Sequence, residues 1–268
     1  MLPDFQMIVH TIPTSEDITV IPVGDVHLGS RECKEQEFID FIEKVKNTPN
    51  VYLLLLGDLI DNGTRNSVTN IFRATMSPSS QKKEMAKLLT PVADRILASV
   101  SGNHEKRKDN RDADDDPCYD IMAKMDKEEL HRENMAFVKI TLGEQYTEDG
   151  VRSNSKYRPS YTICLTHGSG GGALPGSVIN KNERLGFCLD GVDLLVVGHS
   201  HKPMVSQPGK IVVDNRNNKV SIVPFKVVTA TSWLDYGDYA MAKMLQPSSH
   251  ALQKITLSAY RKEMAVTM

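Results

Sequence analysis

Five short polar motifs in the chain combine the residue types that hold metal ions. Carboxylate and amide oxygens together with imidazole nitrogens suit divalent ions of hard or borderline character, and one carboxylate can bridge two of them. The five motifs together supply enough ligands for two such ions. In chain order they are Asp25-Val26-His27, Gly57-Asp58-Leu59-Ile60-Asp61-Asn62, Gly102-Asn103-His104-Glu105, Thr166-His167-Gly168 and Gly198-His199-Ser200-His201.

In two of the motifs, one residue separates two candidate ligands, and this spacing predicts that both ligands face the same site. Side chains alternate along extended backbone, so Asp25 and His27 are expected to point the same way. The same holds for His199 and His201. A single motif of this kind more often caps a loop than binds a metal. Five of the eight histidines fall in these motifs, however, and this agreement favours a metal site.

Each motif follows a run of residues with the pattern of a β-strand. Helical spacing is found between these runs, at residues 35–45, 81–97 and 178–189, with a break expected at Pro91. In α/β sheets, ligands bind outside the carboxyl ends of the strands, where loops converge on a rigid sheet. The five predicted strands span residues 18–23, 51–56, 98–101, 161–166 and 194–197.

The remaining segments are less regular. Residues 106–160 contain a charged loop, a predicted helix near 117–130 and a predicted strand near 136–142, and we interpret them as an insertion or cap over the site. Beyond His201, short β-like runs at 209–214, 219–223, 226–230 and 253–260 predict a second, more antiparallel sheet.

Composition is that of an ordinary globular chain and excludes several classes of protein. With 268 residues, 40% of them apolar, one main domain is expected. No apolar stretch is long enough to span a bilayer and no secretory signal is apparent, so we expect a cytoplasmic protein that does not bind membranes. The net charge of -2 gives no general basic field, so nucleic acid would require a local patch or bound metal. The four scattered cysteines favour reduced thiols.

The five motifs, in this order, resemble those of the calcineurin-like metallophosphoesterase superfamily, and the resemblance covers residues 25–201. It implies a mixed α/β fold: a four-layer α-β-β-α sandwich of two mixed sheets flanked by helices. The whole chain, 1–268, would then be one metallophosphoesterase domain, with 106–160 as a small cap. The compact build is similar to that of the small enzymes of bacteria and their phages.

The resemblance also implies roles for individual residues. Asp25, His27 and His201 would bind one ion, Asn103, His167 and His199 the other, and Asp58 would bridge both. His104 would stand outside the metal ligands and protonate the leaving group, with Asp61 orienting its ring. We expect two divalent ions, manganese first, with iron, zinc or nickel as alternatives.

Three weaker patterns lie near these motifs. Lys106 and Arg107 follow His104 closely enough to reach a bound phosphate, although the acidic residues at 109–116 cancel much of their field. The glycine-rich stretch at 168–176 lacks the ending of a phosphate-binding P-loop, so a flexible loop is the favoured interpretation. Trp233, with the tyrosines at 236 and 239, is interpreted as core packing.

Departures from the subfamilies favour a phosphodiester substrate. The Ser/Thr phosphoprotein phosphatases have Arg-Gly where this chain has Asn62-Gly63, and they normally lack the second histidine of Gly-His-x-His. Phosphodiesterases and the nuclease subunits of double-strand-break repair complexes have both histidines, although those nucleases usually have Asp at the position of Glu105. We therefore expect a phosphodiesterase or nuclease acting on nucleotides, DNA or RNA, with a homo-oligomer among its expected partners. A phosphomonoesterase is the alternative, and a non-catalytic scaffold is the weakest, because no ligand position is lost.

Overall fold

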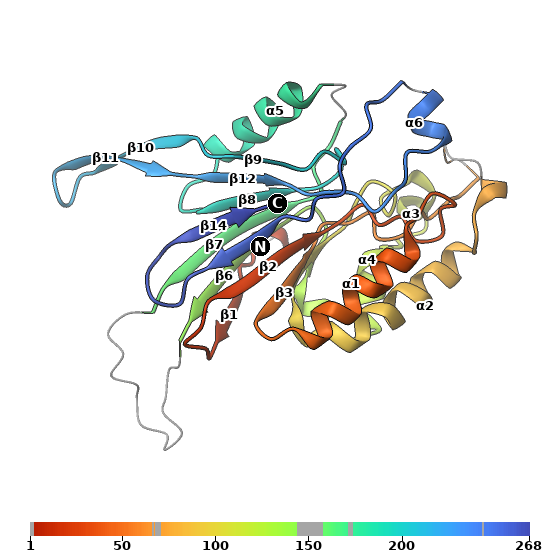
Figure 1. Ribbon diagram of the computed structural model, residues 1–268, viewed down its shortest axis with the longest axis horizontal. Coiled ribbons are helices and arrows are strands. Elements are labelled where there is room, and N and C mark those ends of the chain that lie inside the picture. The colour runs from red at the N-terminus through yellow and green to blue at the C-terminus, as the bar shows by residue number, and fades with distance from the viewer. Residues whose placement is uncertain (1–2, 66, 68–70, 144–157, 171–173, 243) are drawn as a thin grey trace, which may run out of the picture.

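Two sheets lie face to face, with helices outside both, in the computed structural model of the chain (Figure 1). The structure describes residues 3–65, 67, 71–143, 158–170, 174–242 and 244–268. One apolar core fills the space between the sheets. A second lies between sheet I and its helices, and a third lies between sheet II and its helix. The predicted four-layer sandwich of two mixed sheets is confirmed.

Sheet I supplies the first three motifs. Its strand order is β14-β13-β2-β3-β4-β5, in which β2 to β5 run parallel and β13 is antiparallel to β2. Its parallel strands therefore end at the same edge of the sheet. Its strands are β2 (Ile18–Val23), β3 (Val51–Leu55), β4 (Ile96–Val100), β5 (His131–Arg132), β13 (Lys254–Leu257) and β14 (Met264–Thr267).

Sheet II supplies the last two motifs. Its order is β1-β6-β7-β8-β12-β9, in which β7, β8 and β12 are parallel and β6 is antiparallel to β7. Its strands are β1 (Ile8–Ile12), β6 (Met135–Leu142), β7 (Ser160–Thr166), β8 (Leu194–Val197), β9 (Met204–Ser206) and β12 (Lys226–Thr229).

The central strands are apolar throughout because both of their faces are covered. Leu53 and Leu55 of β3 pack toward the helices, whereas Leu54 packs toward sheet II. This alternation follows from the two-residue period of a strand. A continuous apolar run such as 51–56 therefore predicts a strand buried on both faces, as observed.

The helices cover the sheets through apolar faces. In α1, Phe38, Ile42 and Val45 recur at helical spacing and pack on sheet I. The break expected at Pro91 is confirmed, because α2 ends at Leu89 and continues as a 3₁₀ helix. The helices are α1 (Glu35–Asn47), α2 (Pro78–Leu89), α3 (Lys108–Asp112), α4 (Pro117–Ala123), α5 (Pro175–Phe187) and α6 (Asp238–Ala242), with 3₁₀ helices η1 (Pro3–Phe5), η2 (Ile71–Arg73), η3 (Thr90–Arg95) and η4 (Glu128–Leu130).

The last third of the chain differs from the expected second antiparallel sheet. β12 joins sheet II in parallel with β8, and β13 returns to sheet I beside β2. Of the four predicted runs, β10 (Gly209–Asp214) and β11 (Lys219–Pro224) pair with each other as expected, in a hairpin separate from both sheets. The strand runs were predicted correctly, but pairing between distant segments leaves no local signal.

Residues 106–160 contribute to both sheets. β5 lies at the edge of sheet I, β6 lies inside sheet II, and α4 packs in the helix layer with α2. Residues 144–157 lie outside the described residues, so a cap over the site stays a prediction.

Candidate metal centre

The five motifs meet where strands from both sheets end. β2, β3 and β4 lead into the first three motifs, and β7 and β8 lead into the last two. Groups of acidic and histidine side chains gather there with their ligand atoms within 4.8 Å of one another. All seven predicted metal ligands are brought together, in two clusters joined by Asp58.

The first cluster contains Asp25, His27 and His201. His201 Nε2 lies 3.1 Å from Asp25 Oδ1 and 3.4 Å from His27 Nε2. The other carboxylate oxygen, Asp25 Oδ2, accepts a 2.8 Å hydrogen bond from the His199 backbone N–H. This bond fixes the carboxylate so that Oδ1 faces the two imidazoles.

The second cluster contains Asn103, His167 and His199. Asn103 Oδ1 lies 2.9 Å from His167 Nε2 and 2.6 Å from His199 Nδ1. His167 Nδ1 lies 2.7 Å from the Leu56 carbonyl oxygen, to which it can only donate. That contact fixes the tautomer and leaves Nε2 directed at the cluster, as in metal-binding histidines generally.

Asp58 lies between the two clusters. Its Oδ1 accepts a 2.8 Å hydrogen bond from the His104 backbone N–H. Its Oδ2 is 3.8 Å from His27 Nε2 in the first cluster and 3.4 Å from His167 Nε2 in the second. The carboxylate is therefore positioned to serve ions on both sides.

The backbone at these ligands differs from the extended conformation that was expected. Asp25 and His27 have φ of 53° and 52°, and His199 and His201 have φ of 66° and 55°. The paired side chains thus converge through left-handed residues, and strand alternation is not the cause. Asp58, with φ of 49°, shares this conformation, which is strained for residues other than glycine.

Two glycines allow the Asp58 and Asn103 loops to touch. A Cβ on Gly57 would lie 2.2 Å from the Gly102 backbone nitrogen. A Cβ on Gly102 would lie 2.1 Å from Asp58 Oδ1. Any larger residue at either position would separate the two loops and move their ligands apart.

Glu105 joins the same two loops by hydrogen bonds to their backbone, a role that the sequence did not predict. Its carboxylate is 1% exposed and accepts hydrogen bonds from the backbone N–H groups of Asp58 (2.8 Å), Leu59 (2.9 Å) and Gly102 (3.0 Å). Burial, with the nearby Asp58 charge, raises the pKa of Glu105 to about 7. Glu105 is part of the third motif, but the backbone N–H groups that it binds come together only in the folded structure.

The predicted catalytic pair lies at the edge of the clusters. His104 Nδ1 lies 2.8 Å from the Asp61 carbonyl oxygen and 3.4 Å from its carboxylate, and His104 Nε2 lies 3.9 Å from Asp58 Oδ2. The ligand atoms of His104, His27 and Asp58 also lie within 4.8 Å of one another, close enough to hold a metal ion. Burial favours neutral His104, but Asp58 and Asp61 outweigh it and raise the pKa.

The two predicted phosphate contacts are placed differently. Arg107 lies in the site, with Nη2 2.8 Å from His104 Nδ1 and Nη1 bonded to the Asn62 carbonyl at 2.6 Å. Lys106 instead donates to Asn134 Oδ1 at 2.8 Å.

The donor set fits divalent metal ions. Among the described residues, Asp25 Oδ1 is buried, receives no backbone donor and faces only the imidazoles of His201 and His27, at 3.1 and 4.0 Å, so this oxygen is available to a cation. Burial, reinforced by the neighbouring His104, lowers the pKa of His27 to about 3, which keeps this imidazole neutral as a ligand must be. Carboxylate oxygens, an amide oxygen and imidazoles are ligands that manganese, iron, zinc and nickel accept.

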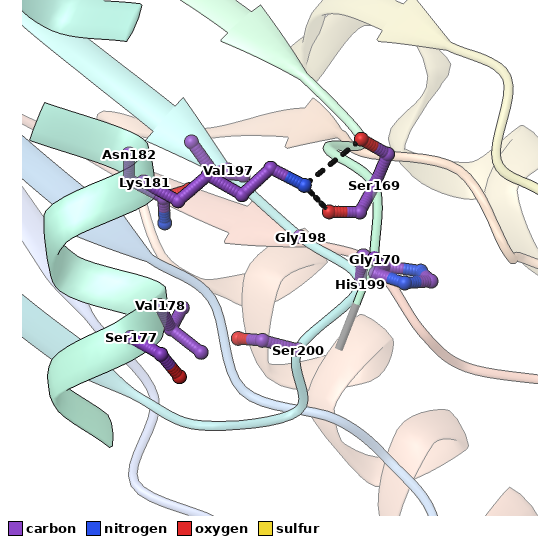
Figure 2. Close-up of a pocket in the computed structure, with 10 residues that line it drawn as sticks. All are labelled: Ser169, Gly170, Ser177, Val178, Lys181, Asn182, Val197, Gly198, His199 and Ser200. Carbon is purple, nitrogen blue, oxygen red and sulfur yellow. Dashed lines mark hydrogen bonds between the residues drawn. The ribbon is translucent and has the colours of Figure 1, made fainter. Parts of the chain in front are cut away.

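A pocket of about 230 Å³ adjoins the second cluster (Figure 2). It lies between α5 and the loop that carries His199 and Ser200. Lys181 reaches from α5 to Ser169, whose hydroxyl oxygen is 3.0 Å from the ammonium, and Ser177 lines the same helix face. Residues 171–173 of the glycine-rich stretch lie outside the described residues.

Comparison with known proteins identifies the family. A family model described as calcineurin-like phosphoesterase matches residues 18–203, and this chain belongs to that family. It is accordingly a metal-dependent phosphoesterase, a hydrolase of a class that uses two divalent ions. No curated protein matches the chain.

Solved structures resemble the chain at low identity. The calcineurin-like phosphoesterase YfkN from Bacillus subtilis is 13% identical, with 94% of this chain and 88% of that one covered and a TM-score of 0.38. A predicted phosphoesterase from Streptococcus pneumoniae is 12% identical, with coverage of 94% and 97% and a TM-score of 0.35. GAP50, the anchor in the inner membrane complex of Plasmodium, is 11% identical, with coverage of 92% and 86% and a TM-score of 0.45.

No helix among the described residues has the length and apolar character needed to cross a bilayer.

We predict that metal loading releases a proton from His167. Burial lowers the pKa of this histidine, but Asp58 outweighs burial and raises it to about 10, so the ring is protonated at neutral pH. A bound ion must displace that proton, and apparent affinity should rise about tenfold per pH unit between about pH 6 and 8. Calorimetric titration of chelator-stripped protein with Mn²⁺, in buffers of different ionisation enthalpy, measures the release. Binding without proton release at pH 7 contradicts the prediction.

We also predict that Glu105→Gln weakens metal binding while the chain stays folded. The amide replaces an acceptor oxygen with a donor that faces backbone N–H groups, so the Asp58 and Asn103 loops lose part of their support. Metal affinity should fall about 10- to 100-fold, as for other groups that orient metal ligands. Dissociation constants for Mn²⁺ are compared with those of Glu37→Gln, an exposed carboxylate on α1. Equal affinities in the two variants would show that Glu105 does not position the ligands.

Proposed function

We propose that this phosphoesterase hydrolyses phosphodiesters of nucleotides or nucleic acids, using two divalent ions. Asp25, His27 and His201 would hold one ion, the second cluster would hold the other, and Asp58 would bridge them. Bound in this way, the ions supply an activated water and neutralise charge on the phosphoryl group. The observation that most supports a diester is the pocket beside His199, which provides space for a second ester group.

The pocket has the chemistry of a site for a polar, anionic substituent. Among the described residues, the Lys181 ammonium bonds neutral oxygens of Ser169, and its charge is therefore available to a ligand. Ser177 and Asn182 add hydrogen-bonding groups, and Val178 gives an apolar wall. A nucleotide leaving group, with its sugar hydroxyls and further phosphates, matches this lining.

His104 is proposed to protonate the leaving oxygen. Asp58 and Asp61 raise the pKa of His104, which favours the protonated ring that a proton donor needs, and contact with Asp61 fixes the ring orientation. Arg107, beside His104, is proposed to contact a phosphoryl oxygen. Lys106 is a weaker candidate, because its ammonium contacts Asn134, whereas the Arg107 guanidinium contacts His104 directly.

The alternative is a phosphomonoesterase. Arg107 favours it, since a guanidinium next to the metal clusters could bind the second charge of a monoester. Manganese as the native metal and a cytoplasmic location remain predictions for either activity.

A substrate panel tests the proposed function. With Mn²⁺ supplied, the protein should cleave bis-p-nitrophenyl phosphate and single-stranded DNA, with kcat/KM at least about tenfold higher for the diester than for p-nitrophenyl phosphate. Turnover should vanish when a chelator removes the metal. Cleavage of the monoester alone would reject the diester preference in favour of the alternative. No cleavage by metal-loaded protein would support a scaffold.

The His104→Ala variant should lose more kcat on substrates with poor leaving groups than on substrates with good ones. Proton donation is worth about 10²- to 10⁴-fold for an alkoxide, whereas p-nitrophenolate leaves with little help. The loss in kcat is therefore expected to be large on thymidylyl-thymidine and below about tenfold on bis-p-nitrophenyl phosphate. Metal content should be unchanged, and His10→Ala, outside the site, is the matched control. Loss of bound metal would instead make His104 a ligand, as its grouping with His27 and Asp58 allows.

A further inference from the structure

The β10–β11 hairpin extends from the end of sheet II that lies away from the metal clusters (Figure 1). β12, which follows the hairpin, begins with Lys226 paired to Leu194, at the start of β8. The clusters lie beyond the opposite end of β8, where His199 follows. A partner bound to the hairpin would therefore leave the site open.

One face of the hairpin is apolar and exposed. In the antiparallel register Ile211 pairs with Ile222 and Val213 pairs with Val220, so these four side chains share one face. They are 75%, 76%, 62% and 65% exposed, respectively. Gly209 and Pro224 complete the same face. We refer to Ile211, Val213, Val220 and Ile222 as the outer face.

The opposite face anchors the hairpin to the body of the protein. Lys210, which pairs with Val223 and so projects away from the outer face, donates to the Gly186 carbonyl at 2.6 Å and also bonds the Leu189 carbonyl. Its ammonium lies 4.3 Å from the centre of the Phe225 ring. These contacts hold the opposite face against the body of the protein and leave the outer face directed toward solvent.

We propose that the outer face is the contact between two copies of this chain. Four β-branched side chains at these exposures present roughly 500 Å² of apolar surface, which is a large patch for a monomer. Two copies packed face to face would bury roughly 1,000 Å², which reaches the lower bound for a biological interface. A single hairpin is marginal in water by itself, so packing against a second one also stabilises its strands.

A second copy fits this face better than other partners do. No charged residue lies on the outer face, and the charged residues of the two strands, Lys210, Asp214 and Lys219, project from the opposite face. The two cross-strand pairs give a surface of similar side chains, which suits the self-complementary contact of a two-fold dimer. Stacked sheets lie about 10 Å apart, a spacing that Ile and Val side chains fill.

The test compares the association of three forms of the full-length chain. By sedimentation equilibrium, the wild type should be a dimer at about 100 μM, because this concentration is well above a dissociation constant in the micromolar range. Ile211→Thr/Ile222→Thr keeps β-branched residues in both strands and should weaken dimerisation at least about 100-fold, because four apolar side chains per dimer are lost. Val212→Thr, on the opposite face, should leave the dimer intact.

Two results would overturn the proposal. One is a wild type that stays monomeric at this concentration, and binding of that monomer to phosphatidylcholine vesicles through the outer face would then identify a membrane as the partner. The other is a double variant that dimerises as tightly as the wild type. Circular dichroism on each variant establishes that the fold is retained. Because the readout is mass, the result is independent of which phosphoester the site cleaves.

Discussion

The site depends on two carboxylates, those of Asp25 and Asp58, that are buried beside the histidines of the two clusters. Asp25 and Asp58 are at most 1% exposed, and burying charge of this kind costs several kcal/mol unless cations and hydrogen bonds compensate. One oxygen of each is satisfied by a backbone N–H from a neighbouring loop, and the other is left for the clusters. The left-handed backbone at Asp25, His27 and Asp58 adds strain that the surrounding sheets must hold.

The rest of the fold makes this arrangement possible. The parallel strands of sheet I and sheet II end side by side, which brings loops far apart in sequence to one place. Gly57 and Gly102 let two of those loops touch, and Glu105 ties them by their backbone N–H groups. The ligand positions are thus set by backbone contacts beneath the site, which makes the metal centre pre-organised.

Much of this was predictable, for physical reasons that differ between elements. The run at 51–56 predicts a strand buried on both faces because its apolar character is local, and the motifs that follow each strand predict the ligands. Pairings such as β13 with β2 were not predictable, because the two segments are far apart in the chain. The contact of Arg107 with His104 and the pocket at Lys181 depend in the same way on how separate loops meet.

The position of β13 has a consequence for how the chain folds. β2, which leads into Asp25, has one edge covered by β13, and Ser232 and Trp233 both donate to the Asp25 carbonyl oxygen. The first ligand loop is therefore complete only after residues near 257 have emerged from the ribosome. Such distant contacts slow folding. Nascent chains will expose the open edge of β2 for most of their synthesis, a period in which chaperones can act.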